Sequence, residues 1–135
     1  MSKEEMPKKF NLEERTACLG EEIIDFVKII PKNEITRPII NQLVRAGTAV
    51  GANYCEADCA ESKKDFEHKM GICNKEAKET KHWMRMLGRA VPEQIDTARR
   101  LWKEAHELNL IFTTIIKNSK NKPSKNNEET SSLDI

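Results

Sequence analysis

Apolar residues recur along most of this chain at the three- and four-residue spacing that is typical of amphipathic helices. Four segments carry this pattern, at about 11–30, 37–60, 63–87 and 93–117. In the third segment the spacings of four and three alternate, as in a coiled-coil seam. The seam comprises Phe66, Met70, Cys73, Ala77, Thr80, Met84 and Leu87. No strand pattern is visible. Four helices with short connections predict an all-α, antiparallel up-down four-helix bundle.

Two of the predicted helices begin with a capping signal. Asn11 followed by Glu14 fits the capping-box pattern, in which the first side chain accepts a backbone N–H bond at the start of the helix. Ser62 followed by Asp65 has the same spacing before the third helix. We therefore expect helices to begin directly after Asn11 and Ser62.

Proline and glycine predict where two helices end. Pro31 stops the first helix, because the residue before a proline is pushed out of the helical region. In the connection that follows, Asn33 or Thr36 can cap the second helix. Gly88 is placed to cap the C-terminus of the third helix.

The ends of the chain are more polar than its centre. Of the 135 residues, we assign 11–119 to one helical bundle, 1–10 to a flexible N-terminus and 120–135 to a disordered tail. The first ten residues, MSKEEMPKKF, lead into no apolar signal core, and no apolar run approaches the roughly 20 residues of a membrane span. We expect a soluble, cytoplasmic protein without a membrane partner.

The second helix carries the most informative stretch, NQLVRAGTAVGANY at residues 41–54. Gly47 and Gly51 lie four residues apart within it, although glycine in a helix costs up to about 1 kcal/mol relative to alanine. Such glycines allow another helix to approach the backbone closely. Because apolar residues also form a second stripe on this helix, we expect it to be covered on two faces, one of them by another subunit.

Polar residues near this stretch are candidates for fixing the geometry. We hypothesise that Arg45 pairs with Glu76 or Glu79 between the second and third helices; the alternative is that these side chains are solvated. The residues assigned to helix packing and assembly are Arg45, Gly47, Gly51, Asn53, Tyr54, Glu56, Glu76, Glu79 and Trp83.

The net charge of +1 does not by itself indicate nucleic-acid binding. A local basic patch on the third helix is the candidate contact for RNA or DNA. It comprises Lys63, Lys64, Lys69, Lys75, Lys78, Lys81 and Arg85. A solvated helix face of mixed charge is the alternative interpretation.

No catalytic or cofactor-binding pattern stands out. Glu79 and His82 form one Glu-x-x-His pair, but a di-iron bundle needs two such pairs. Cys55 and Cys59 lie one helical turn apart, yet no Cys/His spacing matches a zinc site. Buried thiols in a reducing compartment explain the four cysteines more simply. We expect a protein that is not an enzyme and has no metal or cofactor.

Two stretches resemble a known family. NQLVRAGTAVGANYCEA, with its R-x-G-T-x-V-G-A-N-Y-x-E-A core at residues 45–57, and SKKDFEHKMGICNKEAKET are similar to small bacterial four-helix bundle proteins. That family was first noticed in intervening sequences of 23S ribosomal RNA genes. The resemblance covers roughly residues 10–120. It implies a ring-forming oligomer, typically a homopentamer, without a known enzymatic activity.

Related proteins are accessory factors of diversity-generating retroelements. These accessory proteins are basic, and they work with a reverse transcriptase and nucleic acid. The resemblance therefore implies two functions: an oligomeric scaffold or interaction module, or a nucleic-acid-binding accessory factor that uses the lysine-rich patch. This chain is nearly neutral, unlike those accessory factors.

Overall fold

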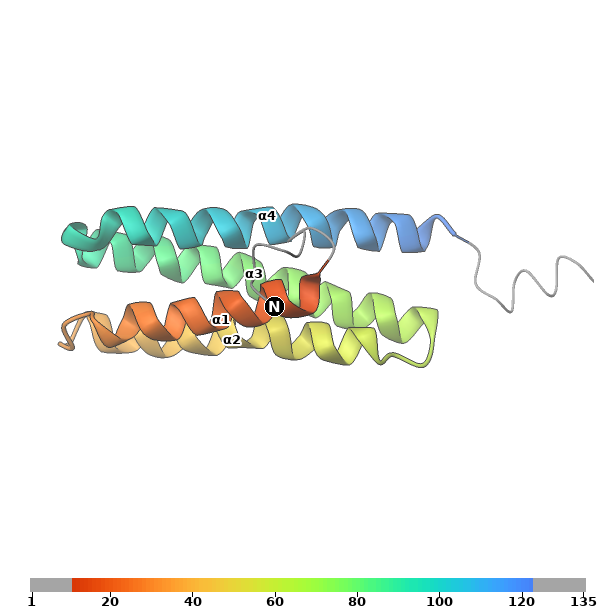
Figure 1. Ribbon diagram of the computed structural model, residues 1–135, viewed down its shortest axis with the longest axis horizontal. Coiled ribbons are helices and arrows are strands. Elements are labelled where there is room, and N and C mark those ends of the chain that lie inside the picture. Colours follow the sequence, from red (N-terminus) through yellow and green to blue (C-terminus); the bar gives the residue numbers. More distant parts are fainter. Residues whose placement is uncertain (1–10, 123–135) are drawn as a thin grey trace, which may run out of the picture.

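Four long helices make up the structure, a computed structural model that describes residues 11–122. They are α1 (Leu12–Lys28), α2 (Thr36–Asp58), α3 (Lys63–Ala90) and α4 (Ile95–Lys120), with a short 3-10 helix, η3 (Pro92–Gln94), before α4 (Figure 1). Within the described range there is no strand, which confirms the all-α prediction. Lys120, which we assigned to the tail, is the last residue of α4. The expectations for residues 1–10 and 123–135 lie outside the described part.

The predicted caps form at the starts of α1 and α3. Asn11 Oδ1 accepts a hydrogen bond from the backbone N–H of Glu14 at 3.1 Å. Ser62 Oγ accepts one from the backbone N–H of Asp65 at 3.0 Å. Each bond satisfies one of the donors that a helix N-terminus leaves without a partner inside the helix.

Neither Asn33 nor Thr36 is the cap of α2, so that prediction is wrong: the N-cap residue is Ile35, which makes no side-chain cap bond, and the two predicted residues instead bond each other across the connection. Asn33 Oδ1 accepts the backbone N–H of Thr36 at 2.9 Å, and Thr36 Oγ1 accepts the backbone N–H of Asn33 at 3.0 Å. The Thr36 hydroxyl also donates to the carbonyl of Pro31 at 2.6 Å. These reciprocal bonds fix the connection between α1 and α2.

Gly88 does not cap α3, so that prediction is wrong. The helix continues to Ala90, and no glycine of the described residues has a positive φ. A Cβ atom at Gly88 would lie 2.9 Å from Ile95 Cδ1 and 3.4 Å from Ala98 Cβ. Gly88 therefore serves close packing between the end of α3 and the start of α4.

Consecutive helices lie side by side along much of their length (Figure 1). Their inward stripes form one hydrophobic core, in which the largest fully buried side chains include Leu19, Ile23, Leu43, Met70 and Phe112. The contact between α1 and α4 is smaller than those between consecutive long helices. The first and last helices therefore depend on few residues for their contact.

Gly47 and Gly51 face α1 of the same chain. A Cβ atom at Gly47 would lie 2.4 Å from Ile23 Cδ1, and one at Gly51 would lie 3.4 Å from the backbone of Thr16. On α1, Gly20 likewise approaches Thr48, at 3.6 Å from its Cα. The expected close helix contact is confirmed, but its occupant is α1. The glycine face is thus covered without another subunit.

Gly47→Ala should lower the free energy of unfolding by about 1 kcal/mol, measured by urea denaturation. Overpacking a core costs about 1–3 kcal/mol, and the gain in helix propensity returns at most about 1 kcal/mol. Adding Ile23→Val removes the clashing Cδ1 atom, so Gly47→Ala should cost less in that background.

Gly71→Ala is the matched control, because no atom lies within 4 Å of its added Cβ. It should stabilise the protein by about 0.5–1 kcal/mol through helix propensity alone. If Gly47→Ala stabilises the protein as much as Gly71→Ala does, the close approach of α1 does not constrain this position.

A buried arginine joins α1 to α4, and sequence analysis did not identify it. Arg15 Nε donates to Glu104 Oε2 at 2.7 Å and its Nη2 to Glu104 Oε1 at 2.9 Å. The same Nη2 donates to Glu107 Oε2 at 2.7 Å. The side chain of Arg15 is 8% exposed. Hydrogen bonding to Glu104 raises the pKa of Arg15, against the opposing effect of burial.

Arg15→Met should lower the free energy of unfolding by about 2 kcal/mol. Breaking a buried ion pair costs about 3–5 kcal/mol, and Glu104 and Glu107 keep part of their hydration here, which reduces that figure. Thermal and urea denaturation would measure the effect.

Arg100→Met is the control, since Arg100 pairs with Glu22 between the same two helices but is 62% exposed. It should cost no more than about 0.5 kcal/mol. Equal losses for the two variants would contradict a special role for Arg15.

Candidate functional site

Arg45 joins α2 to α3, as hypothesised. Its Nη1 lies 3.1 Å from Glu76 Oε2, and its Nη2 bonds Glu79. The Arg45 side chain is 47% exposed, so the cluster lies at the surface of the α2–α3 contact. Desolvation opposes the charged form of Arg45, but the charges of Glu76 and Glu79 outweigh it and raise the pKa. Exposed ion pairs contribute at most about 1 kcal/mol, so this cluster orients the helices more than it stabilises them.

Two further residues of the predicted assembly set have partners of their own. Asn53 Nδ2 donates to the carbonyl of Ala49 at 2.8 Å, within α2. Glu56 accepts a hydrogen bond from Lys69 at 3.0 Å, across the α2–α3 contact. Neither residue joins the Arg45 cluster.

Tyr54 and Trp83 are both half-buried against the core. Burial raises the pKa of Tyr54, and the charge of Asp58 raises it further. The ring of Trp83 meets that of His82 edge to face, with centroids 4.8 Å apart. These two aromatic residues are therefore part of the packing of the helices, and the structure does not gather them into one site.

The basic residues of α3 do not share one surface. Lys69 points toward α2 and bonds Glu56, and Lys63 bonds the carbonyl of Lys122. Lys64 and Lys75 are exposed. The remaining three, Lys78, Lys81 and Arg85, follow each other at spacings of three and four, and the last two border α4.

Lys81 meets two aromatic side chains of α4. Its Nζ lies 3.1 Å from His106 Nδ1 and 5.4 Å from the ring centroid of Trp102. An ammonium group can only donate, so Lys81 is the donor in this bond. Trp102 and His106 stack with centroids 5.1 Å apart and planes 17° apart. Burial lowers the pKa of Lys81, and the charge of Lys78 lowers it further.

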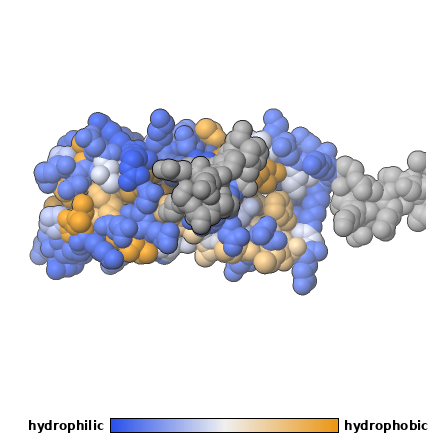
Figure 2. Space-filling model, viewed as in Figure 1, coloured by the Kyte–Doolittle hydropathy of each residue, from blue (hydrophilic) through white to orange (hydrophobic). Residues whose placement is uncertain are grey.

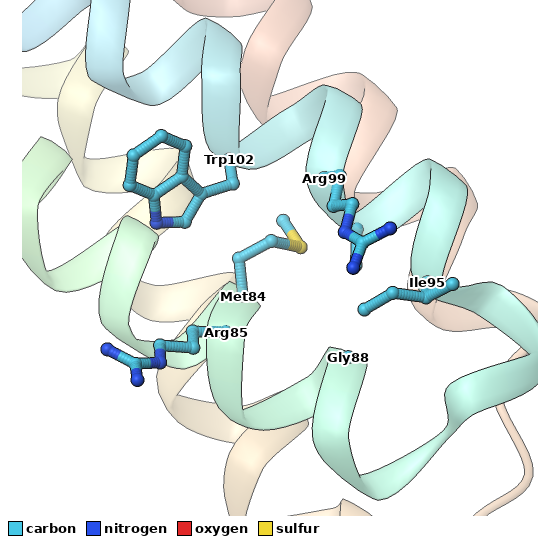
Figure 3. A pocket seen from close by; sticks show the side chains of 7 residues that line it. Met84, Arg85, Gly88, Ile95, Arg99 and Trp102 are labelled. Carbon is cyan, nitrogen blue, oxygen red and sulfur yellow. The ribbon is translucent and has the colours of Figure 1, made fainter.

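A groove of about 400 Å³ lies beside Trp102, between α3 and α4. It is lined by Met84, Arg85, Gly88, Ile95, Ala98, Arg99 and Trp102. Figure 3 shows Met84 and Arg85 projecting from α3 and Trp102 and Arg99 from α4. The floor is apolar, and the only charged residues in this lining are the two arginines.

We call Lys78, Lys81, Arg85, Arg99 and Trp102 the cationic face. None of its four cations takes part in an ion pair with any residue between 11 and 122. Trp102 is 37% exposed. This surface therefore combines positive charges that no carboxylate neutralises with an accessible aromatic ring.

Sequence analysis missed the contribution of α4 to this surface. The predicted basic patch lay on the third helix alone, and Arg99, Trp102 and His106 were not among the predicted site residues. The three residues are spaced at i, i+3 and i+7, which places them along one edge of a helix. That spacing was a usable signal, but their contact with Lys81 depends on how α3 and α4 are aligned.

The two candidate metal-binding pairs, Glu79 with His82 and Cys55 with Cys59, are not joined by further ligands among the described residues. Across residues 11–122, no three His, Cys, Asp or Glu side chains are placed to share a metal ion. Cys55 and Cys59 are exposed, whereas Cys73 is buried. Burial raises the pKa of the Cys73 thiol to about 12. In the same part of the chain, no helix has the length and apolar character to cross a membrane.

Comparison with known proteins identifies relatives of this chain. The family model of the 23S rRNA-intervening sequence proteins matches residues 8–113. A crystal structure from Bacteroides thetaiotaomicron VPI-5482, of a protein of unknown function from the S23 ribosomal protein family, is similar with a TM-score of 0.73 and 28% identity. The similarity covers 82% of this chain and 99% of that one. No curated protein matches the chain.

Proposed function

Since the chain belongs to the 23S rRNA-intervening sequence protein family, we propose that it is a non-enzymatic interaction module whose cationic face binds nucleic acid. One observation carries the proposal: four cations on the α3–α4 surface have no acidic partner among residues 11–122, and three of them, Lys81, Arg85 and Arg99, lie beside the partly exposed Trp102. Guanidinium and ammonium groups bind phosphates, and aromatic rings stack on bases. The cations of this face can therefore bind phosphates, and Trp102 can stack on a base.

The burial of Lys81 supports the same proposal. Its ammonium group is partly desolvated, feels the like charge of Lys78 and bonds His106 Nδ1. An anion placed there would relieve the repulsion between the two lysines. Burying the Lys81 ammonium group without a counter-charge costs the free protein desolvation energy. A hydrogen bond from this ammonium group to a phosphate oxygen would offset that cost.

Binding of a labelled RNA strand should weaken as salt rises, because neutralising phosphates releases counterions. Fluorescence anisotropy at several salt concentrations would measure the slope. Arg85→Gln combined with Arg99→Gln should reduce affinity at least about tenfold and lower the salt slope by about one to two units. Both effects follow from the loss of two phosphate contacts.

The matched control removes two cations elsewhere, Lys28→Gln on α1 and Arg37→Gln on α2, both exposed. That variant has the same net charge as the test variant and should keep most of the affinity. If the two double variants lose equal affinity, binding reflects total charge and not the cationic face.

We also propose that the four helices form an antiparallel up-down bundle. Arg45 in α2 contacts Glu76 in α3, whereas Glu56, later in α2, contacts Lys69, earlier in α3. The hydrogen bonds between α3 and α4 follow the same reversed order. Contacts in opposite chain order support helices that run in opposite directions.

A homo-oligomer, with five copies as the expected ring, is the remaining part of the proposal. With the glycine face of α2 covered by α1, other apolar surface must serve the contact. Ile29 and Ile35, 60% and 66% exposed, flank the connection between α1 and α2. Figure 2 shows hydrophobic residues exposed near this end of the molecule. Their exposure favours burial against another copy.

Light scattering after size exclusion should give a mass near five times the 15.5 kDa of the chain. Ile29→Ser combined with Ile35→Ser should shift the mass toward the monomer, because the contact would lose apolar area. Leu110→Ser is the control, since Leu110 is 57% exposed but lies on α4. A wild-type mass of one chain at all concentrations would rule out the ring.

A further inference from the structure

We infer that the groove beside Trp102 is a binding site for one unpaired nucleobase, so that the ligand of the cationic face is single-stranded nucleic acid. This inference rests on the proposed function and narrows its ligand class. It concerns the groove lined by Met84, Gly88, Ile95 and Trp102, with Arg85 and Arg99 at its border.

The shape and lining of the groove fit a flat, mostly apolar group. Its volume of about 400 Å³ falls within the range of small-molecule sites. Ile95 supplies partly exposed apolar surface above the fully buried Met84, and the indole of Trp102 supplies a ring on which a base can stack. Gly88 adds no side chain that would fill the space.

Trp102 is held in place before any ligand arrives. His106, one turn later on α4, stacks with it, and Lys81 bonds His106 from α3. An aromatic ring that is already fixed loses little conformational entropy on binding. The stack of His106 and Trp102 can therefore extend by one base at small cost.

The charges around the groove suit a base with its flanking phosphates. Lys81 Nζ lies 3.1 Å from His106 Nδ1 and 5.4 Å from the Trp102 ring centroid. Arg85 and Arg99 are among the residues that line the groove, although the end of the Arg85 side chain projects away from it in Figure 3. Proteins that bind single strands combine positive charges, which contact the phosphate backbone, with aromatic side chains, on which the bases stack. An acidic polypeptide would satisfy the charges but leave the stacking surface unused.

A base within a regular duplex is stacked between its neighbours and cannot enter such a groove. Side chains stack on bases mainly in single strands, loops and bulges, where bases can turn outward. The groove therefore favours unpaired over paired nucleic acid, whereas the surrounding cations alone would not distinguish them.

The test uses the fluorescence of Trp102 in the full-length chain. The protein contains two tryptophans, so Trp83→Phe leaves Trp102 as the single reporter. The probes are a single-stranded RNA, the same strand in a perfect duplex, an abasic strand of equal length and polyglutamate. We expect the RNA single strand to quench Trp102 strongly and the other three probes to quench it weakly.

Affinity measurements on Trp102 variants complete the test. Trp102→Leu keeps apolar bulk but removes the aromatic ring, and it should weaken single-strand binding about 10- to 100-fold, as loss of one stacked base does. Trp102→Phe should retain most of the affinity. Neither substitution should change binding of the abasic strand, which a general loss of folding or charge would weaken. Circular dichroism would verify that each variant is helical.

The outcomes separate this inference from the proposed function. If the RNA strand and its abasic counterpart bind equally well, and Trp102→Leu binds both like wild type, nucleic-acid binding stands and the base site is overturned. If polyglutamate binds best and quenches Trp102, the groove serves an acidic protein and both proposals fail. If no polyanion binds at low salt, the proposed function itself is overturned.

Discussion

One bidentate pair of hydrogen bonds, from Arg15 to Glu104, joins the first helix to the last and, with Glu107, constrains how these two helices meet. Consecutive helices are tied by short connections and broad contacts, but α1 and α4 share a smaller contact. In this contact the nearly buried guanidinium of Arg15 pairs with the carboxylates of Glu104 and Glu107. Planar fork geometry makes this pairing directional, so it fixes how α4 lies along α1. Trp102 and Arg99 lie in the same helix as Glu104, and the contact of that helix with α3 places them beside Lys81 and Arg85.

The close contact of α1 with α2 explains why Gly47 and Gly51 are tolerated inside a helix. Ile23 occupies the space that a side chain at Gly47 would need. The two apolar stripes of α2 are thus satisfied mainly by α1 on one side and by α3 on the other. Gly47 and Gly51 therefore do not by themselves indicate a contact with another subunit. The proposed assembly rests on apolar residues that are exposed in the single chain, such as Ile29 and Ile35.

The sequence was sufficient to predict features that are local along the helices. Periodicity predicted the four helices, and Asn11 and Ser62 marked two starts correctly because a cap depends on residues three positions apart. The Arg45 pairing was also predictable, since α2 and α3 are neighbours in sequence. Arg15 and Trp102 were missed because their roles depend on contacts between helices whose alignment periodicity does not determine. Gly88 was misjudged for a related reason: its packing against Ile95 is invisible in the pattern of α3.

Net charge is a poor guide to binding in this protein because the carboxylates that form ion pairs are unevenly distributed over its surface. The chain carries 23 lysines and arginines against 22 acidic residues. Yet Glu76, Glu79 and Glu104 bond arginines at the α2–α3 and α1–α4 contacts. The cations of the cationic face have no such partners among the described residues, and at about 0.1 M salt the dissolved ions largely screen exposed charges that lie more than about 10 Å apart. A nearly neutral protein can thus present a locally positive surface, and this separation of charge is what makes nucleic-acid binding compatible with a net charge of +1.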